Sequence, residues 1–104
     1  MKVELLYVRD CPNYLATAEA VKDVLRECGL PTEISEIEIS TPAEAAQFSF
    51  CGSPTVRVNG NDVEPGPPPA SHFGVSCRSY LVNGRRQGAP DREWISAAIR
   101  RARH

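Results

Sequence analysis

The order of the segments in residues 1–39 constrains the fold of this 104-residue chain most strongly. Residues 3–8, VELLYV, form a short and nearly continuous apolar run, which is typical of a strand buried on both faces of a sheet. Residues 12–28 follow with the apolar stripe of a helix, and residues 32–39 are rich in β-branched side chains. A strand, a helix and a strand in this order predict a parallel pair joined by a right-handed crossover.

The predicted helix at residues 12–28 has a start and a stop signal. Pro12 suits the first helical position, because its missing N–H would have no partner there, and Gly29 is a typical stop. Cys11 is therefore expected to be the N-cap residue. We expect Cys28 to be a core residue without chemistry, because it ends the apolar stripe. The stripe consists of Tyr14, Ala18, Val21, Leu25 and Cys28.

The middle of the chain predicts a short helix and a hairpin. The sequence TPAE at residues 41–44 is a capping box with proline just inside it, so a short helix is expected to run to about residue 48. Residues 55–58 and 61–64 are expected to pair as antiparallel strands, because the Asn59-Gly60 turn between them is of the type that two-residue hairpins favour.

Residues 65–90 differ in character and are interpreted as an insertion before the last helix. The run PGPPP at residues 65–69 predicts a stiff extended connector. Residues 78–82 are interpreted as a short strand or as a strapped-down loop. Asp91 is expected to cap a final helix, whose apolar stripe consists of Trp94, Ile95, Ala98, Ile99 and Ala102.

These segments predict a single α/β domain over residues 1–104, in the order β-α-β-α-β-β-α. The parallel pair and the antiparallel hairpin together give a mixed four-stranded sheet with helices on its faces.

The net charge of −1 predicts neither nucleic acid nor an anionic lipid surface as a partner. No stretch of the sequence reaches the length of a membrane-spanning helix, and the first residues lack the apolar region of a leader peptide, so we expect a cytoplasmic protein without a membrane partner. In that compartment, the four cysteines are more typical of catalysis or metal binding than of structural disulfides.

Two proline motifs and the element order around them resemble the thioredoxin fold. Cys11-Pro12 opens the first predicted helix, and Ser53-Pro54-Thr55 lies just ahead of the third predicted strand. The resemblance implies a cis Ser53–Pro54 peptide bond that faces Cys11. Peptide bonds before proline are those at which the cis form costs little free energy. It covers residues 2–64 and the last helix, and it leaves out residues 65–90.

More narrowly, three motifs are similar to small bacterial thioredoxin-like proteins that are often labelled alkylmercury lyase-like. These motifs are CPNY, GSPTVRVNGNDVEP and FGVSCRSY. A true organomercurial lyase is longer and combines two cysteines with an acidic residue, so the similarity supports the fold better than a mercury reaction. Tyr14 stands where C-x-x-C would have its second cysteine, which excludes disulfide cycling within that motif.

Cys11 is the candidate nucleophile. The thiolate is the reactive form of cysteine, and a helix N-terminus lowers the pKa of a thiol. Arg9 favours ionisation of Cys11, whereas Asp10 opposes it. The alternative is that Cys11 is an inert cap residue.

Cys51 and Cys77 are candidates for a second thiol of the site. Cys51 lies three residues before Pro54, and Gly52 beside it permits a tight turn and a close approach of the backbone; the alternative for Cys51 is a small buried apolar residue. Cys77 is followed by Arg78, whose positive charge would favour a thiolate.

Five further residues are expected to contact a substrate. The backbone of Ser53, Pro54 and Thr55 would hold an extended peptide or thiol, with Pro12 beside it. Tyr14 has two interpretations: its hydroxyl bonds a substrate, or its ring packs in the core.

Three functions remain open at this point. The first is a thiol-disulfide oxidoreductase of the monothiol type, in which Cys11 attacks a disulfide of a protein or small molecule. The intermediate would be resolved by glutathione or another small thiol, by Cys51 or by Cys77. The second is a soft-metal site for Hg(II), Cu(I) or Zn formed by Cys11, Cys51 and Cys77.

The third function is a non-catalytic binding module, as a monomer or a weak homodimer. No other cofactor is expected. His72 and His104 have no metal-ligand spacing to any cysteine and are expected to be exposed.

Overall fold

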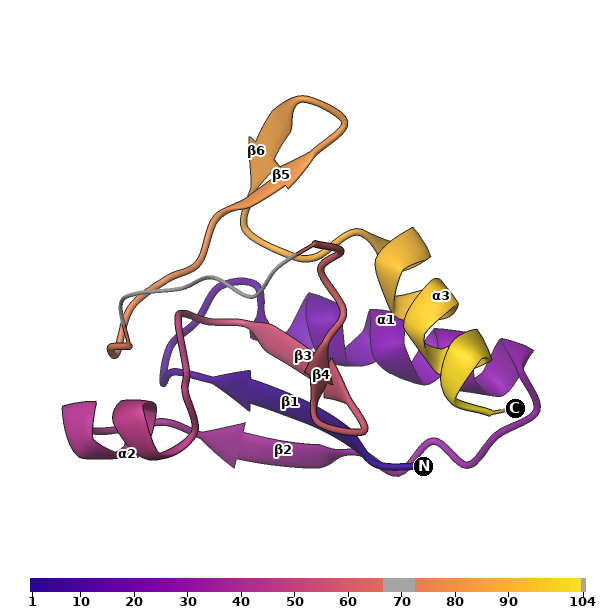
Figure 1. Cartoon of the computed structure of the whole chain (residues 1–104), viewed down its shortest axis with the longest axis horizontal. Helices are drawn as coiled ribbons and strands as arrows, with labels where there is room; N and C mark the ends of the chain where they lie inside the picture. Colours follow the sequence, from indigo (N-terminus) through magenta and orange to yellow (C-terminus); the bar gives the residue numbers. More distant parts are fainter. Residues whose placement is uncertain (67–72, 104) are drawn as a thin grey trace.

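The computed structural model describes residues 1–66 and 73–103, and its strands β1 to β4 form one mixed sheet (Figure 1). The predictions for Pro67 to Pro69, His72 and His104 concern residues outside these ranges. The strand order is β2-β1-β3-β4, in which β1 pairs parallel with β2 and antiparallel with β3, and β3 pairs antiparallel with β4. This confirms the predicted α/β class and mixed four-stranded sheet. The strands are β1 (Val3–Tyr7), β2 (Ser35–Glu38), β3 (Thr55–Val58) and β4 (Asn61–Asp62).

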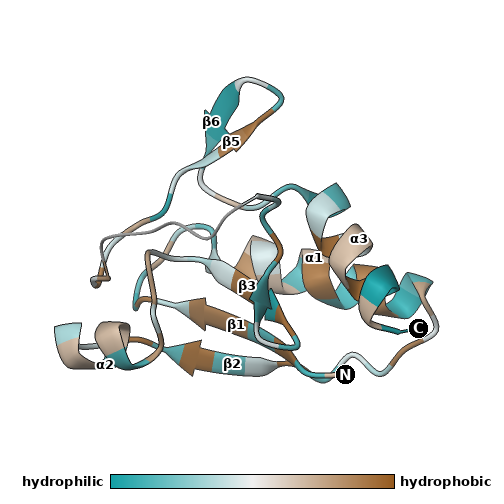
Figure 2. Cartoon of the chain, in the orientation of Figure 1, coloured by the Kyte–Doolittle hydropathy of each residue, from teal (hydrophilic) through white to brown (hydrophobic). Residues whose placement is uncertain are grey.

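The central strand β1 is buried on both faces, as its apolar sequence predicts. Leu5 and Leu6 are both fully buried, and because successive side chains of a strand point to opposite faces, they belong to different cores. Leu5 lies in the core with α1 (Tyr14–Glu27) and α3 (Arg92–Ala102). Leu6 lies in the core beside α2 (Pro42–Gln47). Figure 2 shows β1 as largely hydrophobic, in contrast to the hydrophilic strand β6 (Arg85–Gln87) of a separate sheet.

The helix α1 begins two residues later than predicted. Its N-cap is Asn13, so the prediction that Cys11 caps the helix is wrong. The reason is a tight turn ahead of the helix: the N–H of Tyr14 donates to the carbonyl of Cys11 at 3.3 Å, three residues back. The first bond of helical spacing runs from the N–H of Thr17 to the carbonyl of Asn13, at 3.1 Å. Pro12 therefore lies in the turn and not in the helix.

The other two helices have the caps that the sequence predicts. The Thr41 hydroxyl accepts from the N–H of Glu44 at 3.1 Å, which confirms the capping box of α2. The Asp91 carboxylate accepts from the N–H of Glu93 at 3.4 Å at the start of α3. At the other end of α2, the Arg57 guanidinium donates to the carbonyls of Phe48 and Ser49 at 2.7 and 3.0 Å.

A second, two-stranded sheet lies within residues 78–90. It pairs β5 (Tyr80–Val82) with β6 through a turn at Asn83 and Gly84, both of which have a positive φ. Residues 78–82 are expected from the sequence to form a short strand or a loop held against the fold, and each expectation holds for part of the segment. Residues 80–82 form the strand β5, and Arg78 ahead of it is buried. None of the helices in residues 1–66 and 73–103 has the length and apolar character needed to cross a membrane.

Phe50 holds the loop that leads to Cys51 in place, and Phe50→Ala is expected to destabilise the fold. Its side chain is fully buried with Leu6 and Ala45, so the substitution leaves a cavity and should lower the free energy of unfolding by about 3–5 kcal/mol. Phe73→Ala is the matched control, because Phe73 is exposed and should change stability by less than about 0.5 kcal/mol. Urea denaturation of both variants measures this. Equal effects would contradict the placement of Phe50.

Candidate functional site

Cys11 lies in the turn that joins the end of β1 to α1. Its N–H donates to the carbonyl of Val8 at 3.2 Å, and Asp10 in the same turn has the left-handed backbone angle φ of 63°. Cys11 is a free, half-buried thiol, and Pro12 beside it is exposed. A half-buried thiol in an exposed turn remains accessible to a small molecule.

The loop before β3 is attached to this end of β1 through Ser53. The Ser53 hydroxyl accepts from the N–H of Val8 at 3.0 Å, and the peptide bond from Ser53 to Pro54 is cis. Val8 thus bonds Ser53 through its N–H and Cys11 through its carbonyl. The structure therefore brings the cysteine turn and the Ser53 loop to the same end of the sheet.

The segment before β5 pairs with Ser53 as a short parallel β-bridge. The N–H of Ser53 donates to the carbonyl of Ser76 at 2.9 Å, and the carbonyl of Ser53 accepts from the N–H of Arg78 at 3.0 Å, so Cys77 lies directly opposite Ser53. Both main-chain polar groups of Ser53 are therefore occupied from within the chain. A substrate could bond the N–H and carbonyl of Ser53 only after residues 76–78 separate from them.

The two residues after Ser53 are also engaged internally. The Thr55 hydroxyl donates to the carbonyl of Gly52 at 2.6 Å, and Thr55 is fully buried. The carbonyl of buried Pro54 accepts from the hydroxyl of Tyr80. The Thr55 hydroxyl and the Pro54 carbonyl thus stabilise the loop through bonds within the chain.

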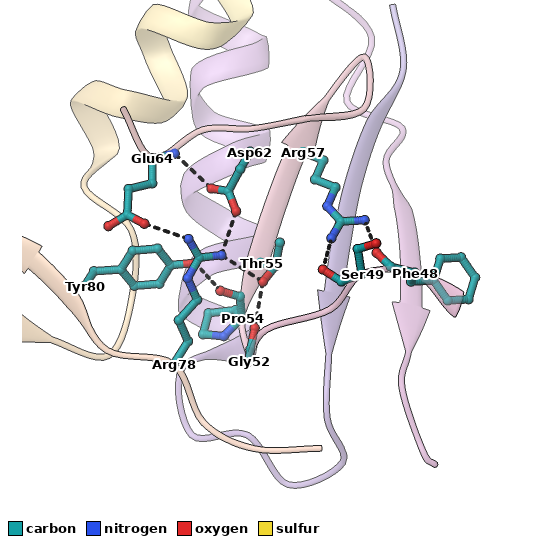
Figure 3. Close-up of polar contacts among 10 residues, drawn as sticks. All are labelled: Phe48, Ser49, Gly52, Pro54, Thr55, Arg57, Asp62, Glu64, Arg78 and Tyr80. Carbon is teal, nitrogen blue, oxygen red and sulfur yellow. Dashed lines mark hydrogen bonds and ion pairs between the residues drawn. The ribbon is translucent and has the colours of Figure 1, made fainter. Parts of the chain in front are cut away.

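Arg78 is the centre of the buried polar network that holds residues 76–80 in place (Figure 3). Its guanidinium donates to Asp62 at 2.7 Å, to Glu64 at 2.8 Å and to the Thr55 hydroxyl at 3.1 Å. It also lies over the ring of Tyr80, 4.3 Å from the ring centre, which is a cation–π contact. Within the described part of the chain, no buried side-chain nitrogen or oxygen lacks a hydrogen-bond partner.

Arg78 keeps its positive charge in this environment. Burial opposes the charged form, but the hydrogen bond to Asp62 and the negative charge of Asp62 leave the pKa of Arg78 above its usual value. The positive charge of Arg78 is thus paired with Asp62 and Glu64. The expectation that Arg78 favours a thiolate at Cys77 stays a prediction.

Gly52 allows the close approach between the Ser53 loop and Arg78. A Cβ atom at Gly52 would lie 2.7 Å from the Cβ of Arg78, and the φ of Gly52 is 138°, which only glycine adopts readily. The predicted close approach at Gly52 is therefore confirmed, and the segment that approaches is the chain's own.

Cys51 and Cys77 lie in two different hollows. Cys77 is exposed and lines a hollow of about 500 Å³ together with Val8 and Arg9. Cys51 is half-buried and lines another hollow of about 720 Å³, with Phe48 and Arg57. The hollow of Cys77 thus includes residues that directly follow β1.

The three cysteines do not form a three-thiolate metal site in this structure. In the part of the chain that the structure describes, no group of three or more His, Cys, Asp or Glu side chains is arranged to hold a metal ion. The convergence of Cys11, Cys51 and Cys77 that the soft-metal hypothesis requires is therefore not found.

Tyr14 uses its hydroxyl within the protein. The hydroxyl donates to the Glu36 carboxylate, and the ring stacks on that of Tyr7 with ring centres 3.9 Å apart. The hydrogen bond to Glu36, together with burial and the charge of Glu36, raises the pKa of Tyr14, so the phenol stays protonated. Tyr14 thus positions the start of α1 against β1 and β2. Cys28 packs half-buried against the core, as predicted.

Comparisons with protein-family models, with curated proteins and with solved structures found no match. The candidate site is therefore defined by its own geometry, which brings together the Cys11 turn, Ser53 and the segment that carries Cys77.

Removing the charge of Arg78 is expected to destabilise the protein strongly. Arg78→Ala leaves Asp62 and Glu64, whose side chains are 17% and 29% exposed, without their partner and should lower the free energy of unfolding by about 3 kcal/mol. Arg86→Ala, at an exposed position of β6, should change it by less than about 0.5 kcal/mol. Urea denaturation at neutral pH measures both. A loss below about 1 kcal/mol in Arg78→Ala would contradict the central place of Arg78.

Proposed function

We propose that the chain has a thioredoxin-like fold and acts as a thiol-disulfide oxidoreductase of the monothiol type, with Cys11 as the nucleophile. The strand order β2-β1-β3-β4 and the approach of the Ser53 loop to the cysteine turn support the fold. The partners are protein or small-molecule disulfides, with glutathione or a similar small thiol as the reductant.

The observation that carries this proposal is the position of Cys11 just before an uncapped helix. No side chain caps the N-terminus of α1, and the first turn contains no acidic residue. The partial positive charge of that end is therefore not offset by an acidic side chain of the first turn. Reactive cysteines are typically found beside such positive charge, and the thiolate is the form that attacks a disulfide.

The proposed reaction proceeds in two exchanges. The Cys11 thiolate attacks one sulfur of a disulfide RS–SR′, forms a Cys11–SR mixed disulfide and releases R′S⁻, which takes up a proton. A second thiolate then attacks the mixed disulfide and restores Cys11. When glutathione supplies that thiolate, RS leaves as its mixed disulfide with glutathione.

Cys11→Ser is expected to abolish the reductase activity, because a serine hydroxyl does not ionise near neutral pH and cannot form the mixed disulfide. The assay follows the reduction of bis(2-hydroxyethyl) disulfide by glutathione, coupled to NADPH oxidation by glutathione reductase. Cys28→Ser is the matched control and should keep the wild-type rate, because Cys28 lies at the far end of α1. Activity of Cys11→Ser above the rate without protein would refute the proposal.

A further inference from the structure

We propose that Cys77 is the resolving thiol of this site and forms an internal disulfide with Cys11. This inference deepens the proposed function and rests on Cys11 as the nucleophile. The sequence alone leaves Cys51, Cys77 and an external thiol as alternatives, and three features of the structure favour Cys77.

The first feature is the direction in which Cys77 points. Cys77 lies opposite Ser53 in the parallel bridge, and residues paired across a bridge direct their side chains to the same face. The Ser53 side chain faces the N–H of Val8, at the end of β1. The Cys77 side chain is therefore directed to that end as well. It lines a hollow with Val8 and Arg9, which lead to Cys11, and with residues 38–40 at the end of β2, while Cys11 itself does not line this hollow.

Arg78 supports this direction independently. Its side chain extends to Asp62 and Glu64 on the opposite face of the segment. Because successive residues of an extended segment alternate between faces, the anchored Arg78 fixes which face Cys77 presents.

The second feature is the short path from Val8 to both thiols. Cys11 bonds the Val8 carbonyl through its own N–H, and Cys77 is paired with Ser53, which bonds the Val8 N–H. The adjacent residues Pro12 and Ser76 are exposed, so the final approach of the two thiols displaces no core side chain.

The third feature is that the other two cysteines have different surroundings from Cys77. Cys51 lines the hollow with Phe48 and Arg57, apart from the hollow of Cys77. Cys28 follows the last turn of α1, whereas Cys11 precedes the first.

The proposed step balances as a two-electron exchange. The Cys77 thiolate attacks the Cys11 sulfur of the mixed disulfide, the Cys11–SR bond breaks, and RS⁻ leaves and takes up a proton. The two cysteine thiols are oxidised to one disulfide while the substrate disulfide is reduced to two thiols. Two molecules of a glutathione-type thiol then reduce the internal disulfide and leave as their own disulfide.

The test is a disulfide map of the full chain after one round of oxidation. Reduced protein is treated with oxidised glutathione, remaining free thiols are alkylated in acid, and tryptic peptides are identified by mass spectrometry. Trypsin leaves Cys11 on the peptide 10–22, Cys77 on the peptide 58–78, and Cys28 and Cys51 together on the peptide 27–57. Each possible linkage of Cys11 to another peptide thus has its own mass.

The expected product in the wild type is the peptide 10–22 linked to the peptide 58–78. Cys77→Ser should instead retain glutathione on Cys11, and it should fold normally because Cys77 is exposed. Cys51→Ser is the matched control and should give the same internal disulfide as the wild type.

Two results would overturn the inference while the proposed function stands. The first is that the wild type retains glutathione on Cys11, as Cys77→Ser does. The second is a disulfide between Cys11 and the peptide 27–57 that is lost in Cys51→Ser. A Cys11 that remains unmodified in the wild type and in Cys77→Ser would overturn the inference and the proposed function together.

Discussion

The buried guanidinium of Arg78 is the interaction on which the arrangement of the candidate site depends. A charge removed from water is costly unless it is paired and hydrogen-bonded, and Arg78 meets this condition with Asp62, Glu64 and Thr55. Such a buried ionic network contributes less to net stability than its contacts suggest. In this chain it connects residue 78 to β3, to β4 and to Glu64. The segment that contains Arg78 runs beside Ser53.

The placement of Arg78 has a direct consequence for the chemistry proposed at the end of β1. With Arg78 directed to the sheet, the preceding residue, Cys77, lines a hollow with Val8 and Arg9, which lead to Cys11. The same segment occupies the main-chain groups of Ser53, so the chain itself fills the position that the sequence assigns to an extended substrate. Residues 76–78 are thus part of the candidate site.

Much of the fold could be predicted from local sequence signals. The apolar run at residues 3–8, the capping box at Thr41 and the Asn59-Gly60 turn each act within a few residues, and each prediction is confirmed. The Asn83-Gly84 turn carries the same hairpin signal and forms β5 and β6, but the sequence around it lacks the clear apolar alternation of a buried strand.

The arrangement of the candidate site depends on contacts that local patterns do not record. Nothing near Arg78 in the sequence marks it as buried, because Asp62 and Glu64 lie 16 and 14 residues away. The error at the start of α1 has a similar cause. Proline is compatible with the first helical position and with a turn, and the bond from Tyr14 back to Cys11 selects the turn.

The proposal requires Cys11 to be the most reactive thiol of the chain. A competition between the thiols for a small amount of alkylating agent measures this. Reduced protein at pH 7 receives less than one equivalent of iodoacetamide, and mass spectrometry measures the label on each cysteine. The account predicts that Cys11 carries most of the label, although it is half-buried and Cys77 is exposed. Labelling that follows exposure, with Cys77 ahead of Cys11, would contradict the account.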